Sequence, residues 1–134
     1  MLNNIYVGSD SKGYTLKKEI IEFLHQNFQS FNVVDLGVFR IEDQIELPVL
    51  AQEVGEKVVQ NQPAIGILID SEGSDLCDFS KEIQGLHPVL CKNLSKTELD
   101  DDSKKNILCI ASSCTPLDSA TQIISNFISN RFQI

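Results

Sequence analysis

The stretch that decides the fold class is residues 64–75, Ala64-Ile65-Gly66-Ile67-Leu68-Ile69-Asp70-Ser71-Glu72-Gly73-Ser74-Asp75. Residues 64–69 are nearly all apolar, which is typical of a strand buried on both faces of a parallel sheet. Polar residues follow at once. The first part of the chain repeats this arrangement, because Gly8-Ser9-Asp10-Ser11-Lys12-Gly13 follows the apolar run 5–7. Ligands bind at the carboxyl ends of strands in an open parallel sheet, so both loops are candidate functional segments.

Short apolar runs alternate with helical patterns along the whole chain. The predicted strands are 5–7, 32–36, 64–69, 88–91 and 106–111, and the predicted helices are 15–28, a second one opened by Pro48, 76–83 ending at Gly85, 95–102 and 117–132. Parallel strands joined by helices require right-handed crossovers. We therefore expect a single domain over 1–134, an α/β doubly wound (Rossmann-like) sheet of five mainly parallel strands with helices on both faces.

Composition limits the classes of partner. The formal charge of −8 argues against nucleic acid, whose binding needs a basic face. No apolar run approaches the roughly 18 residues of a membrane span, and the first residues lack the pattern of a signal peptide, so we expect a cytoplasmic protein. The four cysteines form no CxxC pair, and both histidines lie far from any cysteine pair, so we expect no zinc site. Cys91 and Cys109 lie in strand-like runs, where buried thiols act as small hydrophobes.

The first loop has two interpretations. Asp10 lies at a strand end and is able to accept hydrogen bonds from a polyol ligand, while Gly13 permits close approach of the backbone. The alternative is a purely structural turn, in which Asp10 or Ser11 caps the following helix.

The second loop also has two interpretations. Its backbone N–H groups, at a helix N-terminus, suit an anion or a developing oxyanion, although Asp70, Glu72 and Asp75 would repel a phosphate dianion. A carboxylate here suits a general base if burial raises its pKa toward the working pH. The alternative is a polar loop capped by Ser74 or Asp75.

An ordered series of matches resembles the ribose-5-phosphate isomerase B and galactose-6-phosphate isomerase family. Residues 5–20 resemble its opening, a strand followed by Gly-Ser-Asp-His-Ala-Gly, an aromatic residue and a Leu-Lys helix. Further matches, in chain order, are Val33-Val34-Asp35-Leu36-Gly37, Pro48, Gly66-Ile67-Leu68-Ile69-Asp70, Gly85 and Leu90-Cys91. The resemblance covers essentially the whole chain.

The departures from the family pattern fall on its catalytic residues. Asp70 stands where the family has the cysteine base that moves a proton between C1 and C2 of an open-chain sugar phosphate, and Ser11 replaces a histidine. Lys92 replaces the ring-opening histidine, and Asn93 replaces the Asp beside it. An Ile-Asp-x-x-Gly loop is similar to the A subunit of galactose-6-phosphate isomerase, which assembles with a B-type homologue.

The family also binds phosphate with two groups of arginines. Ser113 or Cys114 occupies the first of these positions, and Arg131 is the only arginine near the second.

The resemblance implies aldose–ketose isomerisation of a sugar phosphate, without a cofactor or a metal. Asp70 would be a surrogate base or a contact to a partner. Implied substrate-binding residues are Asp10, Ser11, Gly73, Ser74, Lys92 and Arg131. Because the family's site lies between subunits, we expect a homodimer or a hetero-oligomer with a B-type homologous subunit.

Two other functions are open. Loss of the base and both histidines is consistent with a non-catalytic sugar-phosphate-binding or regulatory homologue, since fold does not fix function. A phospho-accepting receiver domain would also place acids at Asp10 and Asp70 and use Mg²⁺. Against a receiver, only one acid follows the first strand, and Ala111-Ser112-Ser113 ends the fifth strand without a lysine.

Overall fold

The structure is a computed structural model that describes residues 2–91 and 104–134. The predicted helix 95–102 and the candidate residue Lys92 lie outside the described residues. In chain order the elements are β1 (Asn3–Ser9), the short 3-10 helix η1 (Ser11–Gly13), α1 (Tyr14–Asn27), β2 (Phe31–Gly37), α2 (Leu47–Gln60), β3 (Ala64–Asp70), α3 (Ser74–Lys81), β4 (Pro88–Cys91), β5 (Ile107–Ala111) and α4 (Leu117–Phe132).

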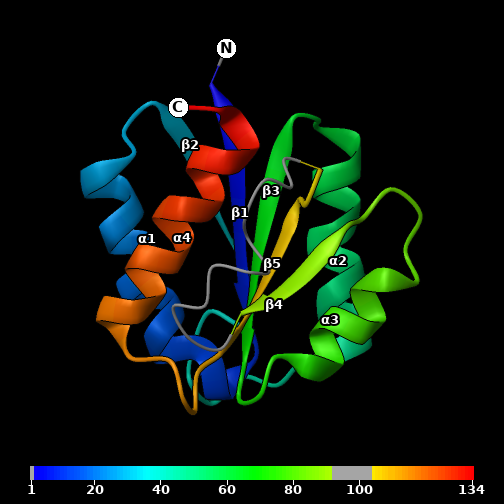
Figure 1. The fold of residues 1–134 in the computed structure, drawn as a ribbon. Coiled ribbons are helices and arrows are strands. Elements are labelled where there is room, and N and C mark those ends of the chain that lie inside the picture. Colours follow the sequence, from blue (N-terminus) through cyan, green and yellow to red (C-terminus); the bar gives the residue numbers. More distant parts are fainter. Residues whose placement is uncertain (1, 92–103) are drawn as a thin grey trace.

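The five strands form one parallel sheet in the order β2-β1-β3-β5-β4, which confirms the predicted fold class (Figure 1). From β1 the chain first adds β2 on one side, and later strands are added on the other side. The order therefore reverses between β1 and β3, and such a point is where ligands bind in open α/β sheets. Ser9 pairs in register with Ile69, so the loops after β1 and β3 leave the sheet side by side.

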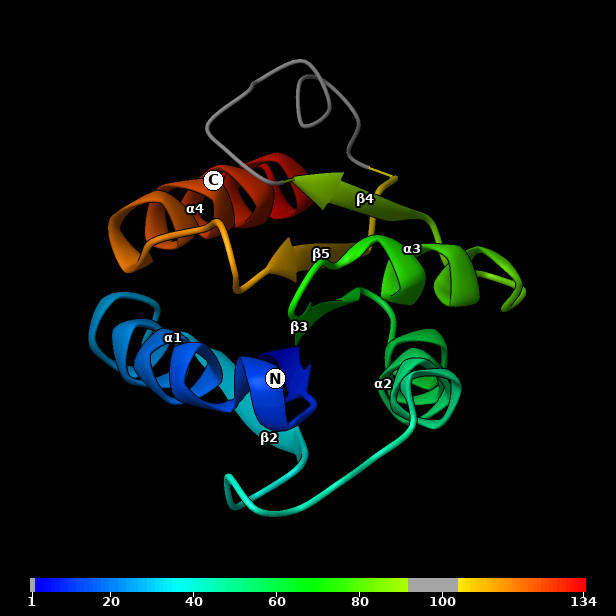
Figure 2. The same cartoon turned by 90° about the horizontal axis from the view of Figure 1, so that it is seen from below.

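Helices cover both faces of the sheet. α1 and α4 lie on one face, and α2 and α3 lie on the other (Figure 2). Every residue of β3 is buried, as its continuous apolar run predicts for a central strand between two helical layers. Cys91 and Cys109 are buried in β4 and β5, in agreement with their interpretation as small core residues.

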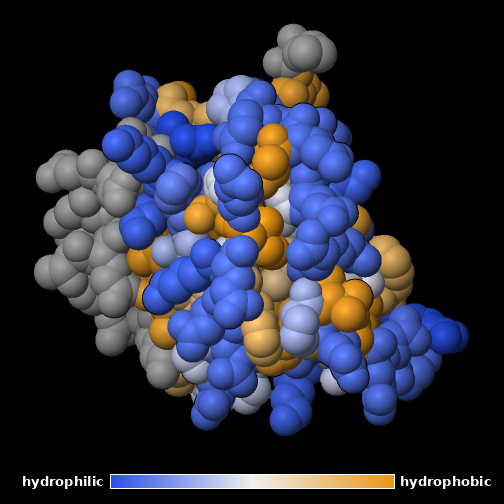
Figure 3. Space-filling model, turned by 90° about the vertical axis from the view of Figure 1, so that its right-hand side faces the viewer, coloured by the Kyte–Doolittle hydropathy of each residue, from blue (hydrophilic) through white to orange (hydrophobic). Residues whose placement is uncertain are grey.

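The outer side of the α2 and α3 layer is not uniformly polar. Figure 3 shows apolar patches among hydrophilic side chains on this side of the molecule. Val49 and Val59, both on α2, are among the exposed large hydrophobic residues. Among the described residues, no helix is long and apolar enough to cross a membrane.

The predicted bounds of α3 are wrong at both ends. The helix begins at Ser74 rather than at 76, because a turn closed by the Asp70 carboxylate starts it earlier. It ends at Lys81, and Gly85 lies in the turns that follow, with φ +93°. Beyond Lys81 the backbone hydrogen bonds run from residue i to residue i−3, as from the N–H of Ile83 to the carbonyl of Ser80 and from the N–H of Leu86 to the carbonyl of Ile83. These bonds replace the α-helical i to i−4 pattern there.

A buried lysine fixes the end of β2. The side chain of Lys17, on α1, is fully buried, and its Nζ donates to the Leu36 carbonyl at 2.7 Å and to the Val38 carbonyl. It also pairs with the Asp35 carboxylate at 2.7 Å. Burial of a charge is costly unless it is paired and hydrogen-bonded, and here three oxygens meet that need. Lys17 therefore joins α1 to the end of β2 and to the start of the loop that follows it. Ile41 lies further along that loop.

Candidate functional site

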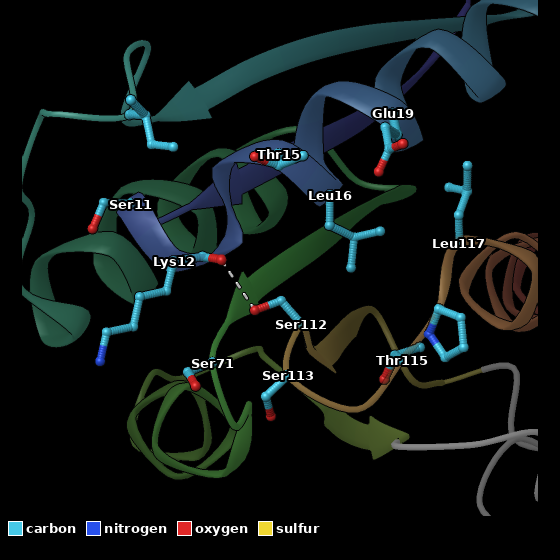
Figure 4. A pocket seen from close by; sticks show the side chains of 12 residues that line it. Ser11, Lys12, Thr15, Leu16, Glu19, Ser71, Ser112, Ser113, Thr115 and Leu117 are labelled. Carbon is cyan, nitrogen blue, oxygen red and sulfur yellow. Dashed lines mark hydrogen bonds between the residues drawn. The ribbon is translucent and has the colours of Figure 1, made fainter.

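A cavity of about 620 Å³ lies at the carboxyl edge of the sheet, where η1 and α1 meet the loops after β3 and β5. Six of its lining residues carry hydroxyl groups, and Lys12 and Glu19 carry charges. The lining residues labelled in Figure 4 are Ser11, Lys12, Thr15, Leu16, Glu19, Ser71, Ser112, Ser113, Thr115 and Leu117. A hydroxyl-rich wall of this kind is able to hydrogen-bond a polyol.

The first loop is a capped turn held against β3. The Asp10 carboxylate accepts a hydrogen bond from the Gly13 N–H at 3.0 Å, so Asp10 is the residue that caps η1. The Asp10 N–H donates to the Ile69 carbonyl at 3.3 Å. A Cβ at Gly13 would lie 2.5 Å from that carbonyl oxygen, so only glycine allows the close approach. The first loop is therefore positioned by the end of β3.

The second loop is closed by Asp70. Its Oδ1 accepts a hydrogen bond of 2.5 Å from the Gly73 N–H, and Gly73 has a φ of +78°. No side chain of α3 caps the helix, so the alternative interpretation, a polar loop capped by Ser74 or Asp75, is wrong. An aspartate three residues before a glycine closes such a turn by itself, because its side chain reaches the N–H that the helix leaves unsatisfied.

Burial raises the pKa of the Asp70 carboxyl above its ordinary value of 3.8. The residue is only 5% exposed, and removal from water disfavours the charged form. The hydrogen bond from Gly73 opposes this increase, whereas the negative charges of Asp10, Asp75 and Glu72 add to it. This is the direction that general-base chemistry at neutral pH requires.

Asp70 lies beside the cavity without lining it. Its neighbour Ser71 lines the cavity, and Asp70 is absent from the lining. Ser112 N–H donates to the Asp70 carbonyl at 2.8 Å, and Ser113 N–H donates to the Ser71 carbonyl at 3.0 Å. These bonds continue the pairing of β3 and β5 past the strand ends and fix the two loops relative to each other.

Sequence reasoning missed several residues of the cavity wall. Lys12, Thr15, Ser112 and Thr115 all line it, yet none was singled out as a binding residue. The signal was available for Ser112, because it directly follows a strand and the carboxyl edge is where such a sheet binds ligands.

The structure brings together most of the predicted site residues but not Arg131. Ser11 lines the cavity, and Asp10, Gly73 and Ser74 lie on the same edge of the sheet. Arg131 is in the last turn of α4, and this helix runs back to the amino edge of the sheet. The two edges are about 20 Å apart, because a seven-residue strand such as β3 rises by roughly 3.3 Å per residue.

At the amino edge Arg131 belongs to a second cavity. Its Nη2 donates to Gln62 Oε1 at 2.6 Å. A separate cavity of about 250 Å³ is lined there by Gln62, Gly85, His87, Lys104, Asn106 and Arg131. Within one chain, Arg131 therefore cannot contact a ligand held in the carboxyl-edge cavity.

Two buried thiols face each other in the core, Cys77 on α3 and Cys109 on β5. A hydrogen bond with Cys109 lowers the pKa of Cys77 to about 7, and burial works against that decrease. The same contact, with burial, raises the pKa of Cys109. Neither thiol lines the carboxyl-edge cavity. Within residues 2–91 and 104–134, no group of three or more His, Cys, Asp or Glu side chains is placed to hold a metal ion.

A family model and a curated relative both match nearly the whole chain. The family model described as Ribose/Galactose Isomerase matches residues 5–134. A Mycoplasma genitalium relative described as a probable ribose-5-phosphate isomerase B is 31% identical over 132 residues, 97% of this chain and 86% of the relative.

Solved structures agree with that match. The crystal structure of ribose-5-phosphate isomerase B from Mycoplasma genitalium, with bound ribulose-5-phosphate, has a TM-score of 0.82 and 31% identity, and the match covers 96% of this chain and 84% of that one. The corresponding enzyme from Clostridium thermocellum has a TM-score of 0.82 and 26% identity, with 98% and 87% covered.

Proposed function

Because the chain belongs to the ribose/galactose isomerase family, we propose that its carboxyl-edge cavity takes an open-chain sugar phosphate and that the chain takes part in aldose–ketose isomerisation. A bound sugar phosphate, ribulose-5-phosphate, in the Mycoplasma genitalium relative supports this class of substrate. The hydroxyl-rich wall offers partners for the hydroxyl groups of such a sugar, and the Asp10 carboxylate lies on the same edge of the sheet.

The observation that carries the proposal is the buried Asp70 carboxyl at the end of β3. Burial and the neighbouring carboxylates raise its pKa, and its neighbour Ser71 lines the cavity. Isomerisation needs a base that takes a proton from C2 of the aldose and returns it to C1 of the enediolate. Asp70 Oδ1 accepts a hydrogen bond from the Gly73 N–H. We therefore assign the transfer of the substrate proton to Oδ2.

We further propose that the chain acts like the A subunit of galactose-6-phosphate isomerase, in an oligomer with a second copy or a B-type homologue. The Ile69-Asp70-Ser71-Glu72-Gly73 loop supports this assignment. Arg131 supports the oligomer, because within its own chain it lies at the far edge of the sheet. If Arg131 binds substrate, it does so in the cavity of a neighbouring subunit.

A second candidate function is sugar-phosphate binding without catalysis. One observation that favours it is that the Gly73 N–H donates to the Asp70 carboxylate. This N–H is therefore already paired and does not serve as a donor to an enediolate. The absence of Asp70 from the cavity lining favours it as well.

An aldose–ketose assay separates the two functions. Ribose 5-phosphate and galactose 6-phosphate are each incubated with the chain alone and with a B-type homologue, and ketose formation is followed. We expect turnover that Asp70→Asn strongly reduces, since this change keeps the shape of the side chain and removes the base. Absence of turnover under every condition, together with calorimetric binding of either sugar phosphate, would establish the non-catalytic function instead.

A further inference from the structure

We propose that Lys12 is the residue that holds the phosphate group of the ligand in the carboxyl-edge cavity. The inference rests on the proposed function, in that it assumes a sugar phosphate as the ligand. Of the described residues that line the cavity, Lys12 is the one with a cationic side chain.

The carboxyl edge is rich in negative charge, so the binding of a phosphate group there depends on a cation. The chain carries a formal charge of −8, and Asp10, Glu72 and Asp75 lie close enough to Asp70 to raise its pKa further. A phosphate dianion that approaches these carboxylates is repelled. Favourable binding requires a positive charge at the cavity itself, and an ammonium group supplies it as a compact charge with three donors.

A hydrogen bond from the opposite wall of the cavity holds the backbone of Lys12. Its carbonyl accepts a hydrogen bond of 3.1 Å from Ser112 Oγ, which joins η1 to the loop after β5 (Figure 4). The side chain extends from η1 on the side where Ser71 is labelled, whereas Glu19 and Leu117 are drawn at the other end (Figure 4). The cavity is therefore polarised, with its cation at one end and its carboxylate at the other.

The serines next to Lys12 complete a phosphate site. Ser71 and Ser113 both line the cavity, and the hydrogen bond from the Ser113 N–H to the Ser71 carbonyl holds them side by side. Their hydroxyl groups are donors for phosphate oxygens, and Lys12 provides the charge. The sugar hydroxyls then extend toward the Glu19 end of the cavity.

Titrations with ribose 5-phosphate, ribose and inorganic phosphate test this assignment. Amide chemical shifts of Ser71 and Ser113 report occupancy in wild type, Lys12→Gln, Lys12→Arg and the control Lys57→Gln. Lys57 is exposed on α2, so its replacement makes the same change in net charge away from the cavity. We expect Lys12→Gln to weaken ribose 5-phosphate binding about tenfold, which is near the lower end for a hydrogen bond to a charged group.

The controls fix what each outcome means. We expect Lys12→Arg to restore most of the affinity, Lys57→Gln to bind as wild type does, and ribose affinity to be equal in all variants. Unchanged phosphate affinity in Lys12→Gln, an equal loss in Lys57→Gln, or no phosphate-dependent shift at Ser71 and Ser113 would overturn the assignment.

Failure of the proposed function gives a different pattern. Lys12-dependent binding of phosphate without any isomerase turnover would count against isomerisation and would support the assignment of Lys12. Turnover with the same KM in wild type and Lys12→Gln would support isomerisation and overturn the assignment.

Discussion

Replacement of Asp70 separates its structural role from its charge. Asp70→Ala removes the acceptor of the Gly73 N–H, which lies 2.5 Å from Oδ1 in a buried position. An unsatisfied buried donor costs about 1–3 kcal/mol, so we expect Asp70→Ala to lower the free energy of unfolding by that amount. Asp70→Asn keeps a side-chain oxygen at the same place and removes the charge.

The raised pKa of Asp70 determines the sign of the Asp70→Asn effect. Since the folded protein raises this pKa above the ordinary value of 3.8, burial and the nearby carboxylates outweigh the hydrogen bond from Gly73 in disfavouring the charged form. Protonated Asp70 therefore contributes stability that is fully present below the unfolded-state pKa and is lost as pH rises through the folded-state pKa. We expect Asp70→Asn to lose this dependence and to be at least as stable as wild type at pH 7.

Urea denaturation followed by circular dichroism, from pH 4 to pH 8, measures both effects. The three proteins are compared at each pH, and the difference between wild type and Asp70→Asn isolates the contribution of the charge. The reasoning is refuted if Asp70→Asn is destabilised at pH 7 as strongly as Asp70→Ala, or if the pH dependence of wild type and Asp70→Asn is the same.

Three further changes test other parts of the structure. Gly13→Ala places a Cβ 2.5 Å from the Ile69 carbonyl oxygen, so we expect it to lower the free energy of unfolding in urea by about 1–3 kcal/mol and to weaken sugar-phosphate binding; wild-type values for both would contradict the contact. Cys109→Ala removes the hydrogen bond that lowers the pKa of Cys77 to about 7, so absorbance titration of the thiolate is expected to show that pKa moving toward 9, whereas an unmoved pKa would exclude the bond as its cause. Lys17→Met leaves two carbonyls without their donor, and we expect urea denaturation to show a loss of about 2–4 kcal/mol, with a loss below about 0.5 kcal/mol as the contrary result.

Periodicity and composition were sufficient to predict the sheet and the edge at which the cavity lies. The all-apolar run 64–69 indicated a strand buried on both faces, and the polar residues after it, from Asp70, indicated the edge at which the structure has its cavity. These features depend on local sequence, because a strand that is covered on both faces needs apolar side chains along its length, as residues 64–69 have. The sequence alone did not reveal the direction in which the pKa of Asp70 is shifted, because that direction depends on how deeply the fold buries the carboxyl and on which carboxylates lie beside it.

Features that depend on long-range contacts were not accessible in this way. A lysine in the helical pattern of α1 looks like a solvent-facing residue, and only the fold shows that Lys17 is buried against the end of β2. The edge on which Arg131 lies depends on the direction of α4, which brings it to Gln62. The position of Lys12 at the cavity wall likewise depends on a long-range contact, the hydrogen bond from Ser112 Oγ to the Lys12 carbonyl.

The most direct test of the account is solvent proton exchange during isomerisation. The chain is combined with a B-type homologue whose base cysteine is replaced by serine, so that Asp70 is the base left to test. Incubation with ribose 5-phosphate or galactose 6-phosphate in D₂O is followed by NMR of the sugar C1 and C2 protons. We predict that deuterium enters the sugar phosphate and that Asp70→Asn abolishes its entry. No incorporation with the wild-type chain, or equal incorporation with Asp70→Asn, would contradict the role of Asp70 as the base.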